Sequence, residues 1–254
     1  MVERQVVSRW AKIDDQWLTV GLLTVAGLGW WWSVVTARQM RSGMGMQGAT
    51  AMMSFAGFLV AWVAMMAAMM LPAIVPVVRL YARGAARGTV PPVPTFLAGY
   101  GAVWSAMGVP VFFVWRRLDG GLVDATPRAG RIAGVVLVAA ALYQLSPFKA
   151  LCLRHCRSPM TFFLRQAKSM HRPAGAVAAG ARHGLYCLGC CWLLMAVLVA
   201  VGTMRLSWMA ALALLILFEK ASPVGEGIAR VAGVAFLGFG LALLLHPAYI
   251  SSLI

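Results

Sequence analysis

The segment RHGLYCLGCCWLLMAVLVAV (residues 182–201) joins a group of thiol side chains to a long apolar run. About 20 apolar residues are enough for one helix to cross the hydrocarbon core of a bilayer. Cys187, Cys190 and Cys191 lie in this segment, and the whole chain has five cysteines. The segment that decides the fold therefore also carries the first candidates for chemistry.

The chain as a whole is strongly apolar. Of its 254 residues, 61% are hydrophobic and 11% are charged, and the mean hydropathy is +0.81. The surface of a soluble protein needs a larger share of charged residues. We therefore expect a single integral membrane domain, residues 1–254, with an all-α fold: a polytopic bundle of transmembrane helices.

The apolar runs predict about seven spans. They lie at Trp17–Thr36, Ala51–Val78, Thr95–Trp115, Gly130–Ala150, Gly184–Thr203, Leu206–Lys220 and Ile228–His246. The sixth is short, so six spans are also possible. The second contains Pro72 and Pro76, and prolines inside a helix predict a kink.

The positive charge is unevenly distributed between the two expected sides of the membrane. The net charge is +15, and about two thirds of the 22 Lys and Arg residues fall on the side of the N-terminus. This pattern predicts a multi-pass protein of the cell inner membrane with its N-terminus in the cytoplasm. No basic patch with interleaved aromatic residues is present, so we expect lipid and not nucleic acid as a partner.

One face of the fifth expected span combines cysteine with histidine. At about 100° per residue, His183, Cys187, Cys190 and Cys191 fall on one stripe of a helix. Such a stripe can converge on one metal ion. Thiol exchange through Cys187 and Cys190, and packing without further function, remain open alternatives.

A second group, CLRHC (residues 152–156), repeats this arrangement. Cys152, His155 and Cys156 occupy positions i, i+3 and i+4 and so share a helical face. We expect both groups at the cytoplasmic end of the bundle, where thiols are kept reduced and disulfides seldom persist. The second group adds candidate ligands at the same membrane depth as the first.

Methionines indicate which metal to expect. The run MMAAMM (residues 65–70) supplies Met65, Met66, Met69 and Met70 as candidate ligands in the second span. At about 1.5 Å per residue, Met69 and Met70 lie roughly level with the cysteines of the fifth span. Thioethers bind Cu(I) well and zinc poorly, so we expect Cu(I), with zinc as the alternative. Core packing explains the same methionines equally well.

One acidic residue lies inside an expected span. Glu219 is close to the end of the sixth run, and an ionisable group in a span is a candidate for function. An interfacial charge pair with the neighbouring Lys220 is the alternative. The sequence contains no catalytic triad, phosphate-binding loop or paired carboxylates typical of a hydrolase.

Four segments resemble a known family. They are WVAMMAAMMLPAIVP (62–76), YQLSPFKALCLRHCRSP (143–159), RHGLYCLGCCWLLM (182–195) and FEK (218–220). They are similar to the bacterial family named domain of unknown function 2182, and the similarity extends from the second span to the seventh. Members are described as predicted metal-binding integral membrane proteins, some as copper chaperones. The resemblance therefore implies metal binding in a membrane.

The expected function is Cu(I) binding and delivery to a copper enzyme, to a metallochaperone or across the bilayer. Low-coordinate thiolate sites suit this function because an ion can pass between ligands without ever being bare. One alternative is an enzyme, a membrane oxidoreductase that uses thiols or a bound metal. The other is a membrane subunit of a copper enzyme whose metal site is structural. We expect a binding protein in preference to an enzyme.

Overall fold

The computed structural model describes residues 2–41, 54–122, 127–158, 160, 163, 169–201 and 206–249, and helices joined by short turns make up most of this part. Within these ranges there are no strands. The helices are α1 (Val2–Arg41), α2 (Phe55–Ala86), α3 (Val93–Leu122), α4 (Pro127–Gln144), α5 (Pro147–Arg157), α7 (Pro173–Val201), α8 (Leu206–Ala221), α9 (Gly225–Leu245) and the 3₁₀ turn η1 (Pro247–Tyr249). The expected all-α fold is confirmed.

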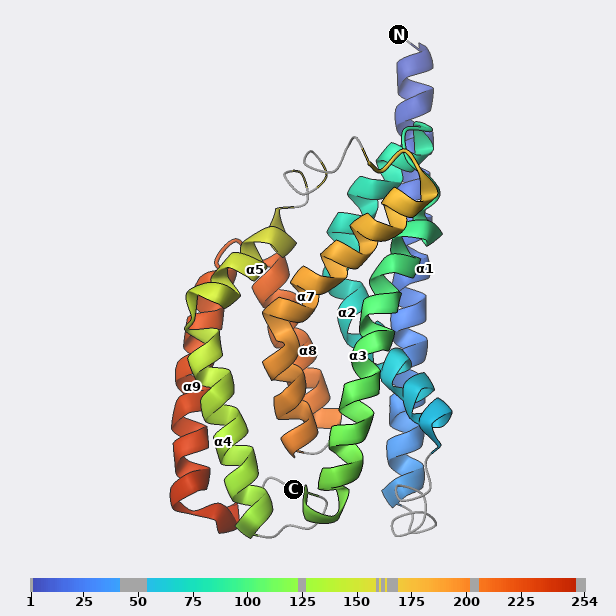
Figure 1. Cartoon of the computed structure of the whole chain (residues 1–254). Coiled ribbons are helices and arrows are strands. Elements are labelled where there is room, and N and C mark those ends of the chain that lie inside the picture. Colours follow the sequence, from blue (N-terminus) through green and yellow to red (C-terminus); the bar gives the residue numbers. More distant parts are fainter. Residues whose placement is uncertain are drawn as a thin grey trace.

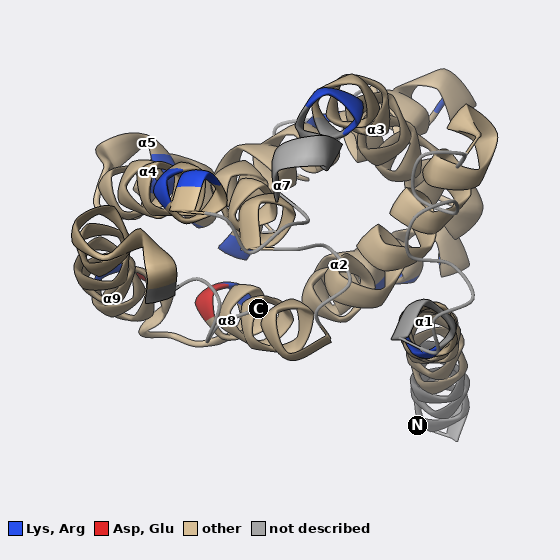
Figure 2. Ribbon diagram, turned by 90° about the horizontal axis from the view of Figure 1, so that it is seen from below, with Lys and Arg blue, Asp and Glu red and all other residues tan. Residues whose placement is uncertain are grey.

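The helices pack in neighbouring pairs around a shared core. α1 lies along α2, α3 along α7, and α4 along α9 (Figure 1). α8 contacts α2, α7 and α9. Buried residues from α1 to α9 form one continuous hydrophobic cluster. Figure 2 shows that Lys, Arg, Asp and Glu occupy little of the helical ribbon.

Five helical segments in the described part of the chain are long and apolar enough to cross a membrane. They are Gln16–Arg38, Phe55–Ala86, Val93–Val114, Pro173–Val201 and Gly225–Leu245, and the bent pair of α4 and α5 makes up to six. α8 has only 16 residues and is not among them. The alternative count of six spans agrees with the upper value, and the count of seven exceeds it by α8.

The expected span Gly130–Ala150 is not one continuous helix. α4 ends at Gln144 and α5 begins at Pro147, with an angle of 65° between them. Ser146 adopts an extended conformation and its side chain caps α5 by accepting from the Lys149 backbone N–H at 3.3 Å. Proline disfavours helix in the residue before it, which explains the break. By contrast, α2 continues without interruption through Pro72 and Pro76.

Two glycines allow α3 and α7 to approach each other at backbone distance. A Cβ atom on Gly99 of α3 would overlap the carbonyl of Val177, and one on Gly180 of α7 would overlap the carbonyl of Phe96. Small residues at such crossings are typical of helix packing in membranes. The α3–α7 contact in turn positions the cysteines of α7.

We predict that Gly99→Ala lowers the thermal stability of the protein in detergent, by about 1–3 kcal/mol, because its methyl group must displace the backbone of α7. Gly101→Ala in the same helix is the matched control, because nothing lies within 4 Å of its added Cβ. The control should be neutral or gain about 0.5–1 kcal/mol. Equal effects of the two substitutions would contradict the assigned packing.

Candidate metal centre

The cysteines of α7 point to one buried face. Cys187, Cys190 and Cys191 are each at most 1% exposed. The thiols of Cys190 and Cys191 both donate hydrogen bonds to the backbone carbonyl of Cys187, at 3.1 and 2.9 Å. These bonds to the preceding turn hold both sulfur atoms on the same side of the helix.

α5 brings a fourth buried cysteine to this face. Cys156 Sγ lies 4.0 Å from Cys190 Sγ, so the two cysteine groups of the sequence meet across the α5–α7 contact. Gly189 makes the close approach possible, because a Cβ there would come within 3.0 Å of Cys152 Sγ. The Tyr143 hydroxyl, near the end of α4, donates to the carbonyl of Gly189 and connects α4 to α7 beside this contact.

Three further helices converge on the thiol of Cys187. Met70 Sδ of α2 is 4.0 Å from Cys187 Sγ, and the Tyr100 hydroxyl of α3 is 3.1 Å away. The ammonium group of Lys220, near the end of α8, donates to the same sulfur at 2.8 Å. The buried thiol of Cys187 is therefore surrounded by a thioether, a hydroxyl and a positive charge. We call Cys156, Cys187, Cys190 and Cys191 the cysteine cluster.

The two predicted histidines lie against aromatic rings. His155 stacks on Tyr186 at 4.6 Å between ring centroids, and its Nδ1 is 2.8 Å from the carbonyl of Leu151. His183 is buried, with its ring 6.1 Å from the rings of both Phe96 and Tyr100. The structure thus places both histidine rings in aromatic surroundings.

The remaining predicted residues surround the cluster without joining it. Cys152 is half-buried against α7. Met66 and Met69 are buried in the hydrophobic core, and Met65 packs against that core. Within the described ranges, no group of three or more His, Cys, Asp or Glu residues is arranged to hold a metal ion. Two contacts between sulfur atoms connect neighbouring helices, Cys156 with Cys190 and Cys187 with Met70, each at 4.0 Å.

A buried ion pair beside the cluster was not predicted. Lys149 Nζ lies 2.7 Å from Glu219 Oε2, and both residues are only 1% exposed. Gln144 Nε2 donates to the other carboxylate oxygen at 2.8 Å. Glu219 is therefore paired with Lys149 of α5 and not with its neighbour Lys220, which corrects the expected interfacial pair. The feature of the sequence that could have predicted this ion pair is Lys149, a charged residue in an otherwise apolar segment.

The ion pair borders a polar pocket at the bend between α4 and α5. The pocket has a volume of about 310 Å³ and is lined by Gln144, Ser146, Lys149, Arg154, Glu226 and Arg230, among others. Arg154 and Glu226 form an ion pair at 2.8 Å, with the arginine side chain 68% exposed. The bend thus carries one buried and one exposed ion pair.

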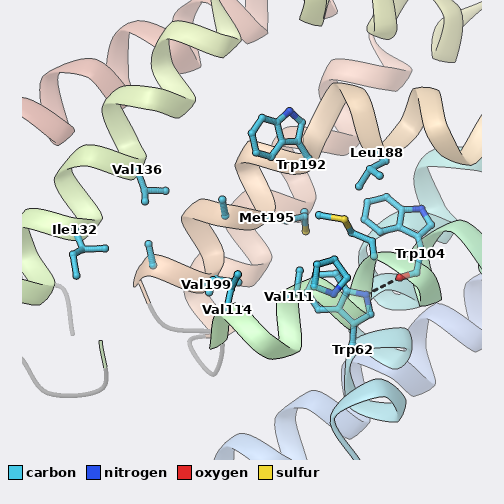
Figure 3. Close-up of a pocket in the computed structure, with 14 residues that line it drawn as sticks. Trp62, Trp104, Val111, Val114, Ile132, Val136, Leu188, Trp192, Met195 and Val199 are labelled. Carbon is cyan, nitrogen blue, oxygen red and sulfur yellow. Dashed lines mark hydrogen bonds between the residues drawn. The ribbon is translucent and has the colours of Figure 1, made fainter. Parts of the chain in front are cut away.

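A second cavity, of about 270 Å³, lies on another face of α7. Figure 3 shows its lining, which includes Trp62, Trp104, Ile132, Trp192 and Met195 from α2, α3, α4 and α7. None of its lining residues is a cysteine, a histidine or a charged residue. This cavity therefore contains no acid, base or nucleophile. The candidate metal ligands lie instead at the cysteines.

Comparison with known proteins gives one family. A family model named PpoB2 and described as a copper chaperone matches residues 59–243. This range contains Cys156, Cys187, Cys190 and Cys191, the methionines of α2 and the ion pair of Lys149 and Glu219. No curated protein and no solved structure gives a significant match.

We predict that Lys149→Met destabilises the protein in detergent by about 3–5 kcal/mol, because it leaves the Glu219 carboxylate buried without its cation. Replacing both residues, Lys149→Met with Glu219→Leu, should recover most of this loss, since apolar side chains of similar volume replace the pair. Thermal unfolding measures both effects.

The exposed pair on the same helix provides the control. Arg154→Met removes an ion pair that is open to solvent, and screening by water leaves such pairs with little influence on stability. A double variant at Lys149 and Glu219 as unstable as the sum of its two single variants would contradict a direct pairing.

Proposed function

The chain belongs to the PpoB2 copper chaperone family, and from this premise we propose that it holds Cu(I) between thiolates inside a membrane-embedded helical bundle and passes the ion to a copper-dependent partner. The family description supports a role with copper. The apolar helices support contact with lipid. The choice of Cu(I) and of its ligands rests on the geometry of the sulfur atoms.

The observation that carries the proposal is the 4.0 Å separation of Cys156 Sγ and Cys190 Sγ. With a metal–thiolate bond of about 2.3 Å, a linear S–metal–S unit spans about 4.6 Å. A small opening between α5 and α7 would therefore admit one ion between the two thiolates. Cys187 and Met70, also 4.0 Å apart, form the adjacent position to which the ion moves.

The chemistry of the donors favours Cu(I) over zinc. Structural zinc takes four ligands in a tetrahedron, and the described residues include no group of even three His, Cys, Asp or Glu side chains arranged for it. Cu(I) is soft and accepts thiolate and thioether ligands. Paired sulfur atoms, one pair containing a methionine, match that preference.

The arrangement of the sulfur atoms favours delivery of the ion. Cys152 is half-buried and lies where α5 meets α7, one helical turn from the buried Cys156. An ion taken up there would pass to Cys156 and Cys190, and then to Cys187 and Met70. His155, His183, Met65 and Met69 are proposed as secondary positions around this route, whereas Met66 is proposed to serve core packing alone.

Burial argues against the alternative of thiol exchange with a protein substrate. Cys156, Cys187, Cys190 and Cys191 are at most 7% exposed, and a thiolate must reach a disulfide to attack it. A single metal ion can reach a buried thiol through a much smaller opening than a disulfide of a protein substrate requires. We therefore propose a carrier of copper and not an oxidoreductase.

The proposed setting is the inner membrane, with the N-terminal part of α1 in the cytoplasm. The surplus of Lys and Arg on that side supports this orientation. α5 lies toward the same end of the bundle as the N-terminal part of α1 (Figure 1). The uptake position at Cys152 would then face the cytoplasm, where Cu(I) remains reduced.

We predict that Cys156→Ser and Cys190→Ser each weaken Cu(I) binding by about tenfold or more, and that the double variant is barely weaker than either single one. Two ligands of one ion are coupled, so the second loss costs less than the first. Competition with a chromophoric Cu(I) chelator, on the reduced full chain in mild detergent, measures the affinity.

Two methionines of α2 provide a matched comparison. Met70→Leu should weaken binding or slow the release of Cu(I), because leucine keeps the volume but lacks the sulfur atom beside Cys187. Met66→Leu, one turn earlier in the core, should have no such effect. Fully additive losses at Cys156 and Cys190, or tight zinc with no Cu(I) binding, would refute the proposed function.

A further inference from the structure

The cation nearest to the proposed copper ligands belongs to Lys220. Its ammonium group is 2.8 Å from the sulfur of Cys187, a residue with no exposed surface. On the same sulfur, the Tyr100 hydroxyl lies at 3.1 Å. Lys220 also lies close enough to interact electrostatically with Cys156, Cys190 and Cys191. Its charge therefore acts on every thiol of the buried cluster.

No carboxylate balances this charge in the part of the chain that the structure describes. Glu219, the neighbour of Lys220, is held by Lys149 at 2.7 Å and by Gln144 at 2.8 Å. The pair of Lys149 and Glu219 is neutral as a unit. The ammonium group of Lys220 therefore lies against the thiols without a carboxylate partner of its own, and a charge in apolar surroundings is costly unless an opposite charge lies close to it.

Binding of Cu(I) by two thiols produces an anionic complex beside this ammonium group. One Cu⁺ replaces the protons of two thiols, giving an anionic dithiolate complex, [Cu(SR)₂]⁻, and two protons that leave to the solvent. No electron is transferred and no other reactant is needed. Ligands must be deprotonated to bind a metal, so the charge of the complex is set by the ion and the number of thiolates.

We propose that Lys220 is the counter-charge of this complex and thereby selects ions whose dithiolate is anionic. The inference rests on the proposed function and adds a residue that sets its specificity. The protonated amine has no lone pair to offer, so it acts through charge and a hydrogen bond to sulfur and not as a ligand. A neighbouring cation favours an anionic complex over a neutral one because their attraction is strong where water is excluded.

Three soft ions allow the effect of the charge of the complex to be separated from the effect of its coordination geometry. Cu(I) and Ag(I) each form a dithiolate of charge −1, whereas Hg(II) forms a neutral dithiolate with the same two-coordinate geometry. All three prefer thiolates. The counter-charge should therefore matter for Cu(I) and Ag(I) and have little influence on Hg(II).

The test measures the affinities of Cu(I), Ag(I) and Hg(II) for the reduced full chain in detergent by competition with chelators. Lys220→Met should weaken Cu(I) and Ag(I) binding by about 10- to 100-fold relative to Hg(II), because only the anionic complexes lose their counter-charge. Lys220→Arg keeps the charge and should largely restore both affinities. Unchanged Hg(II) binding in the Lys220→Met variant reports that the thiol cluster is intact.

Arg131→Met is the control for loss of a cation elsewhere. Arg131 is exposed near the start of α4, at the far end of that helix from α5, so its removal should leave all three affinities unchanged. Equal losses for all three ions in Lys220→Met would mean that Lys220 only supports the fold of the cluster, which overturns the inference.

The same experiment distinguishes the role of Lys220 from the proposed copper function. Tight Cu(I) binding by the unaltered chain, with affinities in Lys220→Met that do not change for any ion, would overturn the counter-charge and leave the copper function standing. Failure of the unaltered chain to bind Cu(I) or Ag(I) would overturn both.

Discussion

The buried ion pair between Lys149 and Glu219 fixes the geometry on which the cysteine cluster depends. Charges in apolar surroundings are tolerated only when paired and hydrogen-bonded, and Gln144 supplies the additional hydrogen bond. The pair ties the end of α8 to the bend between α4 and α5. Because α5 is held there, Cys156 reaches Cys190, and because α8 is held there, the next residue, Lys220, reaches Cys187.

The helical class and most of the apolar helices could be predicted from sequence, because apolar runs of bilayer length have few alternatives to helix. The break in the fourth expected span was missed. Its signal, a serine cap followed by Pro147, is local and was outweighed by the apolar run around it. The 16 residues of α8 were read as a short span, since its length is close to what a span requires.

The cysteine site was predictable to the extent that it depends on one helix. Helical period alone places Cys187, Cys190 and Cys191 on one face, and the structure buries all three. Which groups meet that face depends on how neighbouring helices rotate and pack, which no local pattern specifies. Thus Met70 contacts Cys187 whereas Met65, Met66 and Met69 pack in or against the core, and both predicted histidines lie against aromatic rings.

In the proposed function, two sulfur ligands between α5 and α7 hold Cu(I). X-ray absorption spectroscopy at the copper edge, on the reduced full chain loaded with one equivalent of Cu(I) in detergent, counts those ligands directly. We predict a first coordination shell of two sulfur atoms, which is lost in the Cys156→Ser, Cys190→Ser double variant. A first shell of four ligands dominated by nitrogen or oxygen, unchanged in that variant, would contradict it.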